Sequence, residues 1–269
     1  MIKCMIIGAH PDDCEHAAGI ALKLLDRGHK IKFLTTTNGC SGHHEQMGGT
    51  IAMRRKKEAE KVAKLTGIEY EMLDFDDGFL TAGLPERKRL MRAIREYHPD
   101  IIFTHRPCDY HPDHRATSTL VQDCSYLLQV PNVCPLTPVM DCMPAVFYML
   151  DSFRKPYPLQ PDLMFDIDSV FDRKMEMYHQ YTSQLYEWLP WVDHAIDPQM
   201  PDEDDDAGRL EWLKRTGGQR YARYADEIRD KLIAKYGEAG KKTRYAEALE
   251  MCEYGRQLSP AELADLFCF

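Results

Sequence analysis

Residues 1–13 read MIKCMIIGAHPDD, an apolar run that ends in glycine and is followed at once by a histidine and two adjacent aspartates. A short run rich in isoleucine and methionine, bounded by Gly8, is typical of a strand that is buried on both faces. Side chains that can bind metals therefore begin where the predicted strand ends. In an open parallel sheet, that end of the strands is where ligands bind.

A second cluster of the same kind follows another apolar run. Residues 101–104 read IIFT, and residues 111–114 read HPDH. Neither cluster is specific alone, because Asp, His and Pro are all common in loops. Two such clusters, each placed after a predicted strand, form a more specific signal.

The chain between and beyond the clusters alternates strand-like and helix-like stretches. Strands are expected at 2–8, 31–37, 70–75, 100–104, 145–150 and 163–167, and helices at 15–27, 50–66, 86–97 and about 116–128. Repeats of this length imply parallel strands joined by right-handed crossovers. We predict an α/β fold with a Rossmann-like, doubly wound, mostly parallel sheet.

Beyond residue 168 the pattern becomes helical, with candidate helices at 169–185, 208–236 and 243–256. We therefore expect a catalytic domain over residues 1–186. A mostly helical C-terminal extension, residues 187–269, should pack on the same domain.

Composition argues against two classes of protein. A net charge of −9 argues against nucleic-acid binding, which normally needs a basic face. No run approaches the roughly 18 apolar residues that a membrane span requires.

The nine scattered cysteines lack CxxC spacing, which is typical of free thiols in a reducing compartment. Because a strand begins at once, we expect no signal peptide and a cytoplasmic protein. The oligomeric state stays open, a homo-oligomer included.

The two clusters should meet if the first strand is central, with the strands at 31–37 and 100–104 on either side. His10, Asp13 and His114 would then offer two imidazoles and a carboxylate, a set that holds a divalent ion and leaves a position open. Asp12 would diverge from Asp13, so that one carboxylate binds the ion while the other reaches water as a general base.

His111 and His114 lie three residues apart at a predicted helix start, on roughly one face. One of them can coordinate the ion while the other meets a developing oxyanion or protonates a leaving group. We expect Asp113 to orient and stabilise His111. A nucleotide-binding domain is the competing interpretation, but it needs glycines such as GxGxxG, and the carboxylates at 12 and 13 would repel phosphate.

With these motifs the chain resembles the PIG-L/LmbE-like deacetylases, zinc-dependent enzymes that remove acetyl groups from N-acetylglucosamine-type amides. The resemblance extends to RKKEA at 55–59, to Asp77-Gly78 and to FDID at 165–168, and covers about residues 1–186. It implies zinc ligands, a base (Asp12) and an electrophilic or acidic partner (His111). The implied ligands are His10, Asp13 and His114.

The resemblance also implies that Arg55 and Asp77 help to hold a sugar. Two interpretations stay open for His43, which either lines the pocket or is exposed. Tyr110 either donates to an oxyanion or packs against its neighbours.

The sequence thus predicts a zinc-dependent N-deacetylase for a small N-acetylated amino sugar or glycoconjugate. A His/His/Asp site also suits Fe2+, Co2+ or Mn2+. The alternatives are an amidase for a larger amide conjugate and a non-catalytic metal- or sugar-binding module. Asp12 disfavours the module, because a purely structural site does not need a free carboxylate beside its ion.

Overall fold

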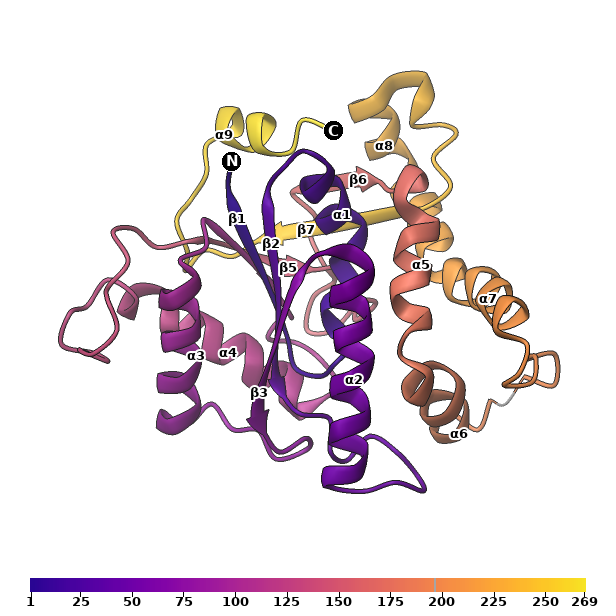
Figure 1. The fold of residues 1–269 in the computed structure, drawn as a ribbon. Helices are drawn as coiled ribbons and strands as arrows, with labels where there is room; N and C mark the ends of the chain where they lie inside the picture. Colours follow the sequence, from indigo (N-terminus) through magenta and orange to yellow (C-terminus); the bar gives the residue numbers. More distant parts are fainter. Residues whose placement is uncertain (196) are drawn as a thin grey trace.

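The structure is a computed structural model that describes residues 1–195 and 197–269. The described residues form a seven-stranded sheet in the order β3-β2-β1-β4-β5-β7-β6 (Figure 1). The strands are β1 (Lys3–Gly8), β2 (Lys30–Thr37), β3 (Glu69–Phe75), β4 (Ile101–Thr104), β5 (Ala145–Met149), β6 (Leu163–Asp166) and β7 (Ala246–Met251).

Most of the described helices are α-helices. These are α1 (Ala18–Asp26), α2 (Gly49–Thr66), α3 (Leu84–Tyr97), α4 (Pro112–Leu127), α5 (Phe171–His179), α6 (Leu189–Val192), α7 (Asp206–Glu227), α8 (Arg229–Tyr236) and α9 (Pro260–Leu266). The short 3₁₀ segments are η1 (Asp13–Ala17), η2 (Asp168–Val170) and η4 (Gly237–Ala239), and η3 (Ser183–Trp188) is a π-helix.

The first strand is central, as predicted. β1 pairs in parallel with β2 on one side and with β4 on the other. The pairs β2–β3 and β4–β5 are also parallel. These pairings confirm the predicted doubly wound α/β fold. Because β1 and β4 are parallel neighbours, the two histidine–aspartate clusters that follow them lie at the same edge of the sheet.

Alternate residues of β1 enter different cores, because successive side chains of a strand point to opposite faces. Cys4 and Ile6 join an apolar cluster with α1, α2 and α5. Met5 and Ile7 join a second cluster with α3 and α4, which lie across the sheet in Figure 1. Burial on both faces explains why this strand appears as an uninterrupted apolar run.

The helix predicted at 243–256 is wrong, because Ala246–Met251 forms β7. This strand pairs antiparallel with β5 on one side and with β6 on the other. Its sequence, AEALEM, consists of good helix formers, but its first four residues are buried in the sheet. Helix propensity is a weak preference that such packing overrides. The pattern also missed α9.

Two other predicted helices are interrupted. The stretch 169–185 contains α5 and the start of η3, and the stretch 208–236 is divided into α7 and α8 at Ile228. Ile228 is buried in a small cluster with Ala225, Leu232 and Ala246. The division into residues 1–186 and 187–269 stays a prediction, although β7 brings part of the second segment into the sheet.

Within the described residues, every helix is too short or too polar to cross a membrane.

A buried arginine fastens the connection between α4 and β5. Arg95 on α3 is 3% exposed. Its guanidinium donates to the carbonyls of Leu127, Leu128, Val130, Val133, Cys134 and Thr137. Carbonyls at a helix C-terminus carry partial negative charge and lack partners within the helix, so a cation suits them. A single side chain therefore fixes most of this connection.

Arg95→Met should lower the free energy of unfolding by about 2–4 kcal/mol, because several carbonyls lose their donor. Arg92→Met, on the exposed side of the same helix, should change it by less than about 0.5 kcal/mol. Urea unfolding followed by circular dichroism measures both changes. Equal stability of the two variants would contradict the role given to Arg95.

Candidate metal centre

A tight turn after β1 separates the two adjacent aspartates. A Cβ atom at Gly8 would lie 2.6 Å from Asp13 Cβ, so this close approach requires glycine. Asp13 Oδ2 accepts hydrogen bonds from the backbone N–H groups of Ala9 (3.1 Å) and His10 (2.7 Å). Asp12 has φ 107°, a strained value for a residue with a side chain. The two carboxylates consequently meet different partners.

Three predicted ligands converge at this turn. His10 Nδ1 lies 3.3 Å from Asp13 Oδ2, and His114 Nε2 lies 3.4 Å from the same oxygen. The two nitrogens are 3.2 Å apart. Ligand atoms on one face of a tetrahedron are about 3.3–3.4 Å apart when each bond to the ion is about 2.0–2.1 Å. The triangle of His10, Asp13 and His114 therefore fits a small divalent ion.

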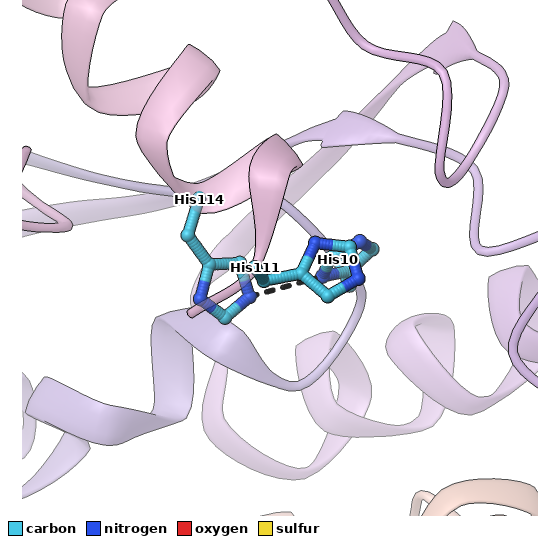
Figure 2. A group of neighbouring side chains, drawn as sticks. All are labelled: His10, His111 and His114. Atoms are coloured by element: carbon cyan, nitrogen blue, oxygen red, sulfur yellow. Dashed lines mark hydrogen bonds between the residues drawn. The ribbon is translucent and has the colours of Figure 1, made fainter. Parts of the chain in front are cut away.

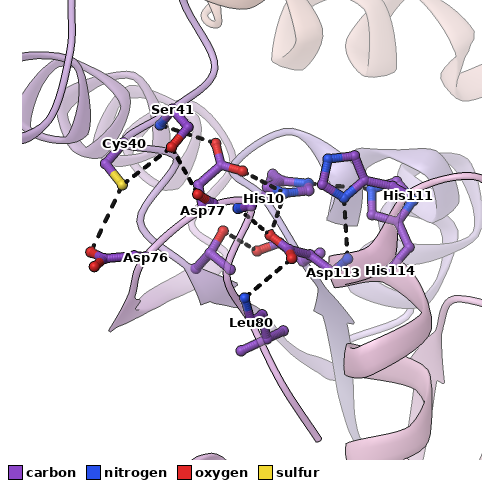
Figure 3. A network of polar contacts seen from close by, with 12 residues as sticks. His10, Cys40, Ser41, Asp76, Asp77, Leu80, His111, Asp113 and His114 are labelled. Carbon is purple, nitrogen blue, oxygen red and sulfur yellow. Dashed lines mark hydrogen bonds and ion pairs between the residues drawn. The ribbon is translucent and has the colours of Figure 1, made fainter.

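Carboxylates stand behind both imidazoles of this triangle. His10 Nε2 lies 3.1 Å from Asp77 Oδ1 and 3.2 Å from Asp113 Oδ2 (Figure 3). His114 Nδ1 lies 3.1 Å from Asp109 Oδ1, an ion-pair contact without good hydrogen-bond alignment. Carboxylates in this position orient histidine ligands and raise their basicity.

The surplus of carboxylates gives the centre a negative charge. Burial alone would lower the pKa of His10, but contacts with Asp113, Asp13 and Asp77 outweigh burial and raise it. Burial alone would raise the pKa of Asp13, but His114 and His105 hold it well below its usual range. Four carboxylates around two imidazoles give the site a negative charge, which attracts a divalent cation.

The orientation and stabilisation of His111 by Asp113 stay a prediction, and the carboxylate of Asp113 contacts His10 instead. Asp113 is fully buried, and its carboxylate accepts from the N–H groups of Gly78 (2.7 Å) and Leu80 (3.3 Å) besides contacting His10 (Figure 3). The turn after β3 thus turns this carboxylate toward His10. Asp113 contacts His111 only through its backbone N–H, which donates to His111 Nδ1 at 3.2 Å.

His111 lies beside the triangle, at the N-terminus of α4. Its ring meets that of His10 edge to face, with centroids 4.5 Å apart, and one of its nitrogens lies within 4.8 Å of ligand nitrogens of His10 and His114 (Figure 2). Because Nδ1 accepts a hydrogen bond, neutral His111 carries its proton on Nε2. Burial and the neighbouring His10 and His114 lower the pKa of His111, which favours this neutral donor form.

Sequence reasoning missed His105 and Asp109. The His105 ring stacks on that of His114 with centroids 4.1 Å apart, and His105 Nε2 lies 3.3 Å from Asp13 Oδ2. His105 comes directly after β4, so its position at the carboxyl end of that strand was the available signal. Asp109 had no comparable signal, because its contact with His114 depends on the fold of the loop before α4.

The side chain of Arg55 contacts Asp12 and is almost fully buried, and the sugar contact that the resemblance implied stays a prediction. The residue is 1% exposed, and its Nη2 donates to Asp12 Oδ1 at 2.8 Å. It also donates to the carbonyl of Pro11 and to the side chain of Gln184, which belongs to the π-helix η3. A Cβ at Gly39, in the loop after β2, would lie 2.8 Å from Arg55 Cδ. This position therefore requires glycine. Burial raises the pKa of Asp12, and Arg55 opposes part of that rise.

A cavity of about 300 Å³ opens in front of the triangle. Asp12 and the three triangle residues line it, and so does Tyr110, which is 71% exposed. Within the described part of the chain, the cavity lining does not include Arg55, Asp77, His43 or His111. Of the side chains expected to contact substrate, Tyr110 alone reaches the cavity.

His43 holds its loop to the C-terminal part of the chain. Its side chain is 1% exposed, and its Nε2 lies 2.9 Å from Glu187 Oε2. Arg54 donates to both oxygens of Glu187, which ties α2 to the same acidic side chain. Both open interpretations of His43 are therefore replaced by a buried structural contact.

Comparison with known proteins gives the following relationships. Residues 5–125 match the family model described as PIG-L: GlcNAc-PI de-N-acetylase. The chain is 28% identical over 198 residues to a diacetylchitobiose deacetylase of Thermococcus kodakarensis, covering 70% of this chain and 73% of that protein. It is 28% identical over 222 residues to a probable N-acetyl-alpha-D-glucosaminyl L-malate deacetylase 2 of Bacillus cereus, covering 78% and 93%.

A hydratase shares the fold. The crystal structure of the 4-carboxy-2-hydroxymuconate hydratase of Pseudomonas putida superposes with a TM-score of 0.71 at 19% identity, covering 96% of this chain and 98% of that one. At this identity the similarity concerns the fold alone.

Asp77→Asn should lower the affinity for zinc by about 10–100-fold, because His10 loses a carboxylate that orients it. Its neighbour provides a matched control: Asp76 is exposed, and its carboxylate contacts the thiol of Cys40 instead of an imidazole. Asp76→Asn should leave the affinity nearly unchanged. Competition with a chromogenic chelator measures both affinities, and equal losses in the two variants would contradict the orientation of His10 by Asp77.

Proposed function

This chain belongs to the PIG-L/LmbE-like deacetylase family, and we propose that it is a divalent-metal-dependent hydrolase. Its proposed substrate is an N-acetylated amino sugar or glycoconjugate, from which it removes the acetyl group. The observation that carries this proposal is the triangle of His10 Nδ1, Asp13 Oδ2 and His114 Nε2, with the carboxylate of Asp12 beside it in one cavity.

His10, Asp13 and His114 would hold the ion. When bound, such an ion supplies Lewis acidity: it polarises a carbonyl oxygen and makes water a stronger acid. We propose zinc, since a set of two histidines and one carboxylate is common in catalytic zinc sites. Fe2+ and Co2+ suit the same ligands.

Asp12 is the proposed general base. Its carboxylate lines the cavity, and Arg55 fixes one of its oxygens. Held in this way, Asp12 takes a proton from water as the water attacks the acetyl carbonyl carbon. Because Arg55 is itself held by Pro11 and Gln184, the base is positioned before substrate arrives.

His111 is the proposed electrophilic partner. Its proton sits on Nε2, since Nδ1 accepts from the backbone N–H of Asp113. From there it can donate a hydrogen bond to the oxyanion. The proton that Asp12 takes from water is then available to the departing amine. Asp113 has two contacts here: its carboxylate faces His10, and its backbone N–H orients His111.

The first experiment is an assay of amine release by the zinc-loaded protein. The panel contains N-acetylglucosamine, diacetylchitobiose, N-acetylglucosaminyl L-malate and a larger N-acylated conjugate. Release of a primary amine together with acetate supports the deacetylase, whereas release from the larger conjugate alone supports an amidase. Since a hydratase shares the fold, addition of water to an unsaturated dicarboxylate is measured in parallel. Inactivity toward all of them, with metal bound, would support a binding module.

Asp12→Asn should lower kcat by at least about 100-fold, because an amide cannot take a proton from water. The amide oxygen can still accept the hydrogen bond from Arg55. Metal content should remain at the wild-type level, as measured by atomic absorption. Loss of the metal together with activity would contradict the separate roles of Asp12 and Asp13.

Arg55→Met should lower kcat by about 10–100-fold with little change in KM, because a misplaced base slows the chemical step. Lys57→Met on the exposed side of the same helix is the control and should leave both constants unchanged. A rise in KM alone in the Arg55 variant would instead support the sugar contact that the family resemblance implied.

A further inference from the structure

Arg220 lies where the catalytic cavity meets a second hollow. This arginine of α7 lines both the cavity of about 300 Å³ and a neighbouring hollow of about 350 Å³. Residues 150–153 also line both. A ligand whose reacting group lies at the triangle could therefore extend past Arg220 into the second hollow.

The positive charge of Arg220 has only neutral partners. Its Nη1 lies 3.1 Å from His16 Nδ1, and its Nη2 donates to the carbonyl of Leu150 at 3.2 Å. Among residues 1–195 and 197–269, no carboxylate oxygen lies within 4.0 Å of this guanidinium. Burying part of a charge without a counter-charge is costly, so a cation kept in this position points to an anionic ligand.

The acidic residues around the second hollow already have partners. Asp151 makes two contacts with Arg106, at 2.6 and 2.8 Å. Glu227 lies 3.6 Å from Arg154. Arg220 and Arg223 remain, and they lie one helical turn apart on α7, beside the same hollow. This local excess of positive charge stands out in a chain of net charge −9.

A hydroxyl group without a partner lies on the same wall. The Oη atom of Tyr224 is buried and makes no hydrogen bond within the described part of the chain. Tyr224 lines the second hollow together with both arginines. A buried donor gains stability when a ligand oxygen accepts from it, so this observation supports a ligand independently of the charges.

We propose that the second hollow is an anion-binding subsite centred on Arg220. The substrate would carry a carboxylate or phosphate on the part attached to the amino sugar, and a guanidinium can bind either oxyanion through two parallel hydrogen bonds. The inference rests on the proposed function, because it assumes that the acetyl group lies at His10, Asp13 and His114. It makes Arg220 a specificity-determining residue, with Arg223 and Tyr224 as further contacts.

The test is a calorimetric titration of the zinc-loaded protein with amines, which a deacetylase cannot hydrolyse. The first pair of probes is glucosaminyl L-malate and its dimethyl ester, and the second is glucosamine 1-phosphate and glucosamine. Within at least one pair, the charged probe should bind at least about tenfold more tightly than the neutral one. The pair that shows the difference identifies the anion.

Arg220→Gln should reduce this ratio of affinities to about one, whereas Arg220→Lys should retain part of it. Arg215→Gln removes the same charge from the same helix outside both hollows and should keep the wild-type ratio. Thermal unfolding at equal metal content checks that the variants are folded. A wild-type ratio near one, or a ratio that persists in Arg220→Gln, would overturn the subsite.

The two proposals fail in different ways. If the protein binds the charged amines through Arg220 but releases no acetate from any substrate, the subsite stands and the deacetylase does not. If it deacetylates neutral and charged sugars with the same kcat/KM, and Arg220→Gln does not alter that ratio, the deacetylase stands and the subsite does not.

Discussion

The carboxylate of Asp13 is the contact on which the centre depends. One of its oxygens accepts from two backbone N–H groups of the turn after β1 and faces imidazoles from both histidine–aspartate clusters. That position exists only because β1 and β4 are adjacent parallel strands. Asp77, Asp109 and Asp113 contact the far nitrogens of these imidazoles, so residues from several loops converge on one site.

The parts of this arrangement that could be predicted follow from local rules. The doubly buried β1 leaves an apolar run, and parallel strands bring their carboxyl ends to one edge. These two facts place His10, Asp13 and His114 together. By contrast, β7 has the composition of a helix and becomes a strand because of the space between β5 and β6. The contacts of Arg55 with Gln184 and of His43 with Glu187 join residues 129 and 144 positions apart, and no local pattern encodes them.

In several loops, buried arginines donate the hydrogen bonds that the backbone carbonyls would receive within a helix or sheet. Arg55 holds the carbonyl of Pro11, and Arg106 donates to the carbonyls of Phe153 and Tyr157 while it pairs with Asp151. Arg95 does the same for the connection after α4. A guanidinium has five donors in a fixed plane, so it can satisfy several backbone acceptors of an irregular segment at once. Arg220 differs from these residues in facing two hollows with donors to spare.

The position of β7 has a consequence for how the chain folds during synthesis. β5 and β6 flank a slot that is filled by Ala246–Met251, about eighty residues beyond β6. Until that segment has emerged from the ribosome, β5 presents an open edge, and β6 has no strand to pair with. Unpaired edges of this kind recruit strands from other molecules. A nascent chain that stops before residue 246 therefore exposes these edges, although every residue of the candidate metal centre has been made.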